Sequence, residues 1–455
     1  MVNKKIDLKH QARRKSIKEG IFATARTSFG DYYISPFAIA INTSNSIVAM
    51  LTSLSGLLGP LSQTLSPKTT KNLTRKKVVS RSVFLEALTW IPIIILAILY
   101  YKGIMINLLP IMLLISYCLF TILSNISTPA WFSWMGDIVD ANYRGRWFSK
   151  RNLITGFVSI IIALVSSIFL DYFKKNDLVM FGFIILFGLA MISRLISWKI
   201  LKKQYEPVQK TIERKREPFF KFLKNAPKNN FGKFVLFRSS LAFSAAICSP
   251  LLGVYLLRNL NLSYINYMIV IMGGTFVSLF TLEIWGKFAD KYGNYKAIVI
   301  SSIFIPVLPI LWILYKSPVY LVLIPSVIEG IVWAGLLLAA GNFIYDNVST
   351  EKRAQAISYY NMMWGIGVFL GASIGAILVG IIKTPSLEPV IIVFIISAVI
   401  RTIVVIFWLP KFKEIKKTEK FKLTSAIKYI IKREARTTIK EEVHQLMTIK
   451  KYLKP

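Results

Sequence analysis

The chain contains a succession of long apolar runs, each of roughly 20 residues, and these runs limit what it can fold into. A helix of that length, rising about 1.5 Å per residue, matches the ~30 Å hydrocarbon core of a bilayer. Because lipid offers no hydrogen-bond partners, the backbone of such a run must satisfy itself as a helix. Hydrophobic residues make up 54% of the 455 residues and charged residues 17%, and the mean hydropathy is +0.54, which excludes a soluble globular protein. The sequence predicts an all-α membrane protein.

Twelve such spans are predicted, in two groups of six. We expect them at about 20–43, 45–65, 79–101, 105–134, 152–172, 177–200, 233–257, 264–285, 297–315, 319–342, 355–382 and 388–409. The predicted parts of the chain are a basic N-terminal tail (1–19), a six-helix bundle (20–202), a basic linker (203–232), a second six-helix bundle (233–410) and a basic amphipathic tail (411–455). Within the linker, the aromatic stretch from Phe219 to Lys224 is expected to lie at the lipid headgroups.

The charge of the chain, +35, is placed in a way that fixes an orientation. Lys and Arg gather in the two tails and in alternate loops, whereas the intervening loops are nearly free of them. Such an asymmetry marks the basic loops as cytoplasmic, facing anionic lipid headgroups. We therefore predict a multi-pass protein of the cell membrane with both termini in the cytoplasm, and no nucleic-acid partner.

A short polar pattern occurs twice along the chain. Asp137, Arg144, Asn152 and Gly156 are matched by residues of the same type 209 positions later, namely Asp346, Arg353, Asn361 and Gly365. Each copy lies between two apolar runs, so each is expected to form a tight loop between membrane helices. An Asp and an Arg seven positions apart can clasp across such a loop. The repeat predicts two related, pseudo-symmetric halves.

Residues typical of catalysis or metal binding are sparse. His10 and His444 lie in the tails, and Cys118 and Cys248 fall inside apolar runs, where core positions are expected. Metal-ligand spacings and nucleotide-, zinc- or serine-hydrolase motifs are absent from the sequence. We expect neither an enzyme nor a cofactor nor a metal site.

The loop after the eighth predicted span carries the most specific motif. It reads Gly286-Lys-Phe-Ala-Asp290-Lys291-Tyr-Gly293-Asn-Tyr-Lys296 and resembles the G-x-x-x-D-[RK]-x-G-x-x-[RK] signature of the major facilitator superfamily. Small Gly286 would let two helices approach, Asp290 would face a helix N-terminus, and Gly293 would serve the sharp turn. The resemblance covers about 20–410, and it implies two parallel six-helix repeats with a substrate site near mid-bilayer.

The sequence departs from the family pattern in places that bear on the subclass. In the corresponding loop of the first half, Lys71 replaces the expected Asp and Thr74 the expected Gly, although Arg75 and Lys76 keep the basic pattern. The glycine run typical of drug–proton antiporters is missing from span five. In span eleven, Gly367, Gly371 and Gly375 echo it without the proline, and we interpret them as sites of close helix packing. The subfamily stays unassigned.

Charged residues within a bilayer are costly and therefore suggest function. The deep acids are Asp31, Glu86 and Glu329. Asp31 and Glu329 are expected about 15 Å into spans one and ten, near the midplane. The resemblance implies that these two spans help to line the central cavity. Glu86 lies on span three, which the resemblance makes more peripheral. The alternative for each is a structural acid bonded to a neighbouring Tyr, Ser or Arg. Polar or aromatic candidates around them are Tyr32, Asn125 and Trp333.

Together these features predict a monomeric secondary transporter that moves a small solute by alternating access. A carboxyl group shielded from water can take up a proton and release it when water enters, so protons are the expected coupling ion. The predicted cytoplasmic gate comprises Gly286, Asp290, Lys291, Gly293, Asp137, Arg144, Asp346 and Arg353. Two alternatives remain: an uncoupled facilitator, and a non-transporting membrane sensor or anchor on the same fold.

Overall fold

A computed structural model describes residues 2–140, 144–207, 218–349, 352–385 and 387–416, and all regular structure within these ranges is helical. Residues 208–217 of the predicted linker and the predicted amphipathic tail beyond residue 416 lie outside them. Eleven helical segments of the described chain are long and apolar enough to cross a membrane, which fits the predicted all-α membrane fold. They are Asn45–Thr64, Arg75–Tyr101, Leu109–Ile138, Trp147–Lys175, Val179–Lys202, Asn230–Asn259, Tyr264–Tyr292, Asn294–Leu314, Pro318–Asn347, Gln355–Ile381 and Pro389–Lys411.

The first predicted span, 20–43, is helical but is not among these eleven. It consists of α1 (Val2–Arg26), a π-helical turn η1 (Thr27–Asp31) and α2 (Tyr32–Ala40). Its charges, hydroxyl groups and tyrosines lower its hydropathy below that of the other spans. The helix begins at Val2, so the basic tail predicted over 1–19 continues directly into this span.

The chain divides into two compact units. The first comprises Met1–Lys215, Ala242–Ile269 and Asn361–Val393, and the second comprises Arg216–Leu241, Val270–Tyr360 and Phe394–Pro455. Four helices contribute to both, namely α11 (Asn230–Ala246), α13 (Tyr264–Tyr292), α18 (Arg353–Ile381) and α19 (Pro389–Trp408). The two bundles expected over 20–202 and 233–410 remain a prediction.

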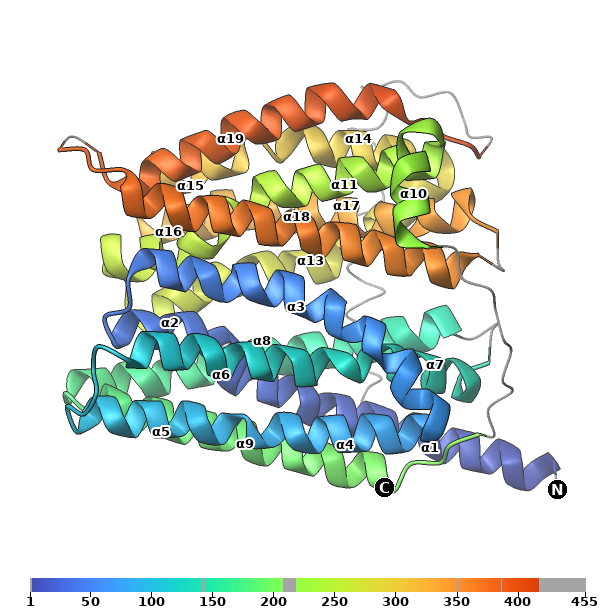
Figure 1. The fold of residues 1–455 in the computed structure, drawn as a ribbon, viewed down its shortest axis with the longest axis horizontal. Coiled ribbons are helices and arrows are strands. Elements are labelled where there is room, and N and C mark those ends of the chain that lie inside the picture. The colour runs from blue at the N-terminus through green and yellow to red at the C-terminus, as the bar shows by residue number, and fades with distance from the viewer. Residues whose placement is uncertain (1, 141–143, 208–217, 350–351, 386, 417–455) are drawn as a thin grey trace. The chain divides into compact units, whose positions relative to one another are not determined.

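Helix α9 (Val179–Lys202) lies alongside several helices of the first unit. It packs against α1, α4 (Arg75–Leu88) and α5 (Trp90–Tyr101), while α3 packs against α6 (Figure 1). The other elements are α3 (Asn45–Asn72), α6 (Leu109–Ile126), α7 (Thr128–Ile138), α8 (Arg144–Lys175), η4 (Ser249–Leu251), α12 (Leu252–Val254) and η5 (Tyr255–Asn259). Gly30 permits a close approach here, because a Cβ at this position would overlap the Trp90 ring.

The second unit is built around α14 (Asn294–Phe304) and α17 (Val327–Asn347), which pack together. Its other elements are α10 (Phe219–Asn225), η3 (Ala226–Lys228), α15 (Leu308–Leu314), α16 (Pro318–Leu321), η6 (Val322–Ser326) and η7 (Leu409–Lys411). The stretch from Phe219 to Lys224, which is expected at the lipid headgroups, is helical and lies within α10. Glycines bring the backbones together: a Cβ at Gly330 would overlap the carbonyl of Gly274.

Three π-helical turns interrupt the spans, and each lies close to a proline. They are η1 before Pro36, η5 after Pro250, and η6, which contains Pro325. Proline lacks the N–H that would continue the helical ladder, so the backbone nearby is irregular. Such turns occur frequently at functional sites. Asp31 is the last residue of η1, and Glu329 follows η6 within one turn, so two predicted acids lie beside irregular backbone.

Candidate functional site

A cavity of about 450 Å³ lies within the first unit. It is formed mainly by α3, α6 and the part of α18 that belongs to this unit, with Asp31 contributed by η1. Most of its lining can hydrogen-bond or offers an aromatic ring. The lining residues are Asp31, Thr52, Ser55, Gly56, Gly59, Pro60, Gln63, Tyr117, Phe120, Thr121, Ser124, Asn125, Asn361, Trp364 and Val368.

Close helix packing brings α18 to this cavity. A Cβ at Gly365 would approach the Gly56 carbonyl and the Pro60 ring to 2.5 Å, so glycine is needed there. Further along α18, Gly371 and Gly375 pack on the backbone of Phe243 and Ile247. The interpretation of these glycines as packing positions is thereby supported. Gly365 and Asn361, both members of the sequence repeat, thus meet α3 and the cavity.

Two amide side chains in the wall fix one another. Gln63 donates from Nε2 to Oδ1 of Asn125 at 3.2 Å, and Asn125 donates from Nδ2 to the Thr121 carbonyl at 3.0 Å. Their orientations are therefore set by the protein, while Gln63 Oε1 and one N–H of each amide remain for a solute. The prediction that Asn125 is a polar site residue fits this position.

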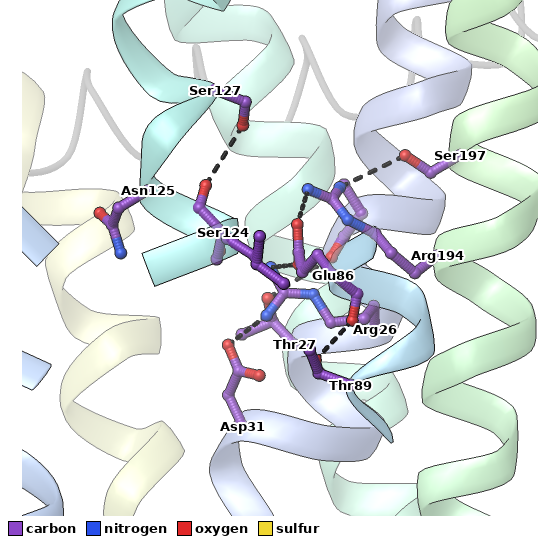
Figure 2. Close-up of polar contacts among 12 residues, drawn as sticks. Arg26, Thr27, Asp31, Glu86, Thr89, Ser124, Asn125, Ser127, Arg194 and Ser197 are labelled. Atoms are coloured by element: carbon purple, nitrogen blue, oxygen red, sulfur yellow. Dashed lines mark hydrogen bonds and ion pairs between the residues drawn. The ribbon is translucent and has the colours of Figure 1, made fainter. Parts of the chain in front are cut away.

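Asp31 is held by Arg26, five residues earlier on the same span. Arg26 Nη1 lies 2.5 Å from Asp31 Oδ2 (Figure 2). The other carboxylate oxygen, Oδ1, is buried and has no hydrogen-bond partner among the described residues. Asp31 thus combines one paired oxygen with one that can accept a proton or a donor group.

Behind Asp31, buried charges of alternating sign form a continuous chain. Arg26 also lies 3.3 Å from Glu86, and Glu86 lies 2.5 Å from Arg194 (Figure 2). Arg194 is 3.9 Å from Glu19, whose carboxylate is 3.4 Å from Arg151. Glu86 is completely buried, and Ser197 donates to Glu19 at 2.9 Å.

This chain, which we call the charge ladder, contains Asp31, Arg26, Glu86, Arg194, Glu19 and Arg151. Its three carboxylates and three guanidinium groups balance. Buried charges are tolerated when they are paired and hydrogen-bonded in this way. Glu86 therefore holds two arginines inside the unit and is not among the residues that line the cavity, and Arg194 is its buried partner.

Glu329, the second predicted midplane acid, lies in the second unit. Its Oε2 accepts a hydrogen bond of 3.1 Å from Trp312 Nε1, and Trp333 and Arg401 are its other polar neighbours. Arg401 is buried and donates to the Ile305 carbonyl at 3.2 Å. Glu329 is not among the residues that line the cavity. Trp333, predicted as a substrate residue, thus accompanies Glu329 on α17.

Tyr32, the remaining predicted site residue, lies against α8. Its hydroxyl group is 3.2 Å from Ser159 Oγ, which is also 3.0 Å from Ser28 Oγ. Tyr32 is not among the cavity-lining residues, although it directly follows Asp31.

The repeated aspartates bind the start of a neighbouring helix in each half. Asp137, near the end of α7, pairs with Arg75, the first residue of α4, at 2.7 Å. Asp346, near the end of α17, accepts a hydrogen bond of 2.6 Å from the side-chain amide of Asn294, the first residue of α14. A glutamate also accepts a backbone hydrogen bond at the start of each of these helices. Glu206 accepts from the Lys76 N–H at 3.1 Å, and Glu414 accepts from the Tyr295 N–H at 2.9 Å. We call these two arrangements the latches.

In the second half, the expected Asp–Arg clasp is not what the structure shows. Asp346 bonds to Asn294, whereas Arg353 lies over the Tyr345 ring, 4.6 Å from its centroid. In the first half Asp137 pairs with Arg75, and the side chain of Arg144 is outside the described residues. The physical reason in the second half is that the Asn294 amide, at the start of the adjacent helix, lies within hydrogen-bonding distance of Asp346, whereas Arg353 lies over the Tyr345 ring.

The signature loop is partly as predicted. Gly293 has a φ of +98° and precedes α14 directly, so glycine is required at this turn. Gly286 is not at a close approach, because a Cβ there would meet only Leu338 at 4.0 Å. Asp290 is exposed on α13, and Asp346 and Glu414 bind the start of α14 instead. Lys291 lies 5.4 Å from the centroid of the Tyr292 ring.

Several residues of the site were not predicted. They are Arg26, Gln63, Trp364, Glu19 and Glu206. A signal existed for Asn361, which belongs to the sequence repeat. The pairing of Arg26 with two acids could not be found from spacing, because Glu86 lies on a different helix.

Comparison with known proteins supports the same fold. The family model described as Major Facilitator Superfamily matches residues 20–248 and 234–448, one match for each half. No curated protein sequence matches the chain.

Similar solved structures include a mutant of the nucleoside transporter NupG, with 17% identity, a TM-score of 0.67, and coverage of 89% of this chain and 100% of that one. A D-xylose–proton symporter has 12% identity and a TM-score of 0.68, with 90% and 99% coverage. A bacterial homologue of the iron transporter ferroportin in the inward-facing state has 13% identity and a TM-score of 0.64, with 88% and 98% coverage.

At these identities the structures establish the fold, and the family model spans nearly all of both halves. With its membrane helices, its repeated latches and the Gly293 turn, the chain belongs to the major facilitator superfamily of membrane transporters.

Proposed function

We propose that this transporter is a secondary carrier that moves a small solute by alternating access, coupled to protons at Asp31. The solute would occupy the cavity between α3, α6 and α18. In the same proposal the protein works as a monomer in the cell membrane, with both termini in the cytoplasm and its basic loops against anionic headgroups.

The observation that carries this proposal is the position of Asp31. Asp31 lines the cavity, its Oδ2 is tied to Arg26, and its Oδ1 is buried without a hydrogen-bond partner among the described residues. A proton that enters from the cavity would bind this carboxylate and weaken its hold on Arg26. Arg26 would then pair more fully with Glu86, so that protonation of Asp31 changes the ion pairs along the charge ladder.

The latches support a gate at the predicted cytoplasmic end. Each latch joins the end of the fourth span of its half to the start of the third span. Each also includes a glutamate that follows the sixth span of that half, Glu206 or Glu414. Such contacts can hold the cytoplasmic ends of the helices in one arrangement and release them in another.

Polar contacts also join the two sequence halves at the predicted extracellular end of the first unit. Arg258 donates to the Thr43 carbonyl at 2.8 Å, and Asp171 accepts from the N–H groups of Tyr264 and Ile265, each at 2.8 Å. In an alternating-access cycle these contacts would separate when the cavity opens to the outside.

An uncoupled facilitator is the second candidate, and one observation favours it. Because Arg26 already neutralises Asp31, the pair could be purely structural. Accumulation measurements decide between the two: a coupled carrier concentrates its solute when a pH gradient is the only driving force, whereas a facilitator only equilibrates it. A sensor or anchor would move no solute in either condition.

The solute for this experiment is first found by thermal stabilisation across a solute library, since a ligand that binds the folded state raises its stability. Purified protein in liposomes with an imposed pH gradient should then accumulate the labelled solute. Equilibration without accumulation would replace the coupled carrier by the facilitator.

A further inference from the structure

We infer that the solute is uncharged and ring-shaped, with several groups that both donate and accept hydrogen bonds, as in a sugar or a nucleoside. This inference rests on the proposed function, because it assigns a chemical class to the solute of the same cavity. It follows from the charge, the hydrogen-bonding groups and the aromatic surface of the wall.

The wall has no charge to spare for an ionic solute. Asp31 is the single charged side chain among the described residues that line the cavity, and Arg26 is bound to it. The six charges of the charge ladder cancel. A carboxylate or phosphate would meet no cation in the lining, and an ammonium group at Asp31 would lie next to the Arg26 guanidinium. An anion would therefore lose its hydration without gaining a charged partner, and a cation would have to share the Asp31 carboxylate with Arg26, so either ion binds at a cost.

The hydrogen-bonding groups are of mixed character. Gln63, Asn125 and Asn361 each carry an amide, which both donates and accepts. Gln63 and Asn125 are oriented by their mutual bond, which leaves Gln63 Oε1 as an acceptor and an N–H on each as a donor. Sugar hydroxyls and nucleobase edges have the same mixed character, so they can satisfy these amides without any net charge.

An aromatic surface completes the site. Trp364 is 39% exposed, and it lines the cavity together with Tyr117 and Phe120. The Phe120 ring already has two partners. The Tyr117 ring stacks on it with 5.6 Å between the ring centroids, and Arg26 Cζ lies 5.3 Å from the Phe120 centroid. The Trp364 ring therefore offers a face on which a planar or pyranose ring can pack. A volume of about 450 Å³ lies in the range of pockets that hold small ligands.

The test compares probes that differ by a single charged group. Binding of glucose, glucuronate and glucosamine, and of uridine and uridine monophosphate, is measured by calorimetry on the purified protein in nanodiscs. We expect a neutral probe from at least one series to bind, and its charged counterparts to bind on the order of tenfold more weakly or not at all, as expected when a buried polar group is left unpaired. The series that binds distinguishes sugar from nucleoside.

Two nearly isosteric variants locate the effect. Asn361→Asp adds an unpaired negative charge to the wall, so it should weaken the neutral probe by on the order of tenfold. Asn261→Asp makes the same change in an exposed loop and should leave binding unaltered. Unliganded melting temperatures show whether each variant is folded, and Gln63→Glu provides a second wall position.

Three results would overturn the inference. A charged probe could bind more tightly than its neutral counterpart, or no neutral probe could bind at millimolar concentration. The third is an unchanged affinity for the neutral probe in folded Asn361→Asp and Gln63→Glu proteins. Failure of the transport proposal would look different, because a protein that binds neutral solutes yet moves none in liposomes keeps the solute class and loses the carrier function.

Discussion

Asp31 and Glu329 were predicted as equivalent midplane acids, and both lie beside a π-helical turn, but the surroundings of the two carboxylates differ. Asp31 lines a cavity and ends a chain of six balanced buried charges. Glu329 accepts a hydrogen bond from Trp312 and lies outside the lining of that cavity. The difference indicates that related halves need not share chemistry. A carboxylate in the charge ladder is linked to charged groups on several helices, whereas Glu329 has Trp312 and Trp333 and the neighbouring Arg401 as its polar partners.

The largest expected effect comes from removing the centre of the charge ladder. Glu86→Gln leaves Arg26 and Arg194 buried without their shared acid, which should cost about 3–5 kcal/mol of stability. Glu329→Gln is the matched change in the second unit, and its altered hydrogen bond with Trp312 should cost about 1–3 kcal/mol. Thermal unfolding followed by circular dichroism measures both. Equal losses in the two variants would argue against the ladder as a coupled group.

A double variant sharpens the same comparison. Replacing Glu86 and Arg194 together by Gln leaves two balanced pairs, Asp31 with Arg26 and Glu19 with Arg151. The double variant should therefore be more stable than Glu86→Gln alone, with a coupling energy of about 1–3 kcal/mol. Additive losses in the double variant would show that the charges act independently.

The two latches offer a smaller effect, again unequal between the halves. Asp137→Asn weakens an ion pair with the buried Arg75, whereas Asp346→Asn alters a hydrogen bond to the neutral Asn294. The Asp137 side chain is 48% exposed, so solvent screening limits its loss to about 1 kcal/mol or less. We expect both variants to slow transport, Asp137→Asn more than Asp346→Asn, with solute affinity within a few-fold of the parent.

Arg353→Ala is a useful companion, because in this structure Arg353 contacts Tyr345 and not Asp346. Its effect on transport rate should be smaller than that of Asp346→Asn. Loss of solute binding in any of these latch variants, with an unchanged conformational distribution, would argue against a gate.

Membrane orientation can be tested without disturbing either acid. Cysteines introduced at the exposed positions Lys228 and Asn261 should behave oppositely in intact cells. An impermeant thiol reagent should label Asn261→Cys and leave Lys228→Cys unmodified until the membrane is permeabilised. Labelling of Lys228→Cys in intact cells would reverse the predicted topology.

Much of the fold followed from the sequence because its causes are local. The length of the apolar runs and the sharp turn at Gly293 depend on a few neighbouring residues, and the described helices and the φ of Gly293 agree with them. The span containing Arg26 and Asp31 was predicted despite its low hydropathy, and the structure explains the charges by their pairing.

The partners of the charged residues did not follow from the sequence, because they depend on which helices touch. Asp346 was expected to meet Arg353 seven residues later, but it accepts a hydrogen bond from Asn294 on α14. The partners of Glu86, which are Arg26 on α1 and Arg194 on α9, could likewise not be read from its place on span three. Only packing in three dimensions brings these groups together.

Proton-driven accumulation in liposomes tests the central claim most directly. The solute identified by thermal stabilisation is supplied to Asp31→Asn and Glu329→Gln proteins, with a pH gradient as the only driving force. Exchange at equal pH serves as the control, since exchange requires only that the loaded carrier reorients. If Asp31 carries the proton, Asp31→Asn should exchange the solute and fail to accumulate it, whereas Glu329→Gln should still accumulate it. Accumulation by a folded Asp31→Asn protein to the level of the parent would contradict the account.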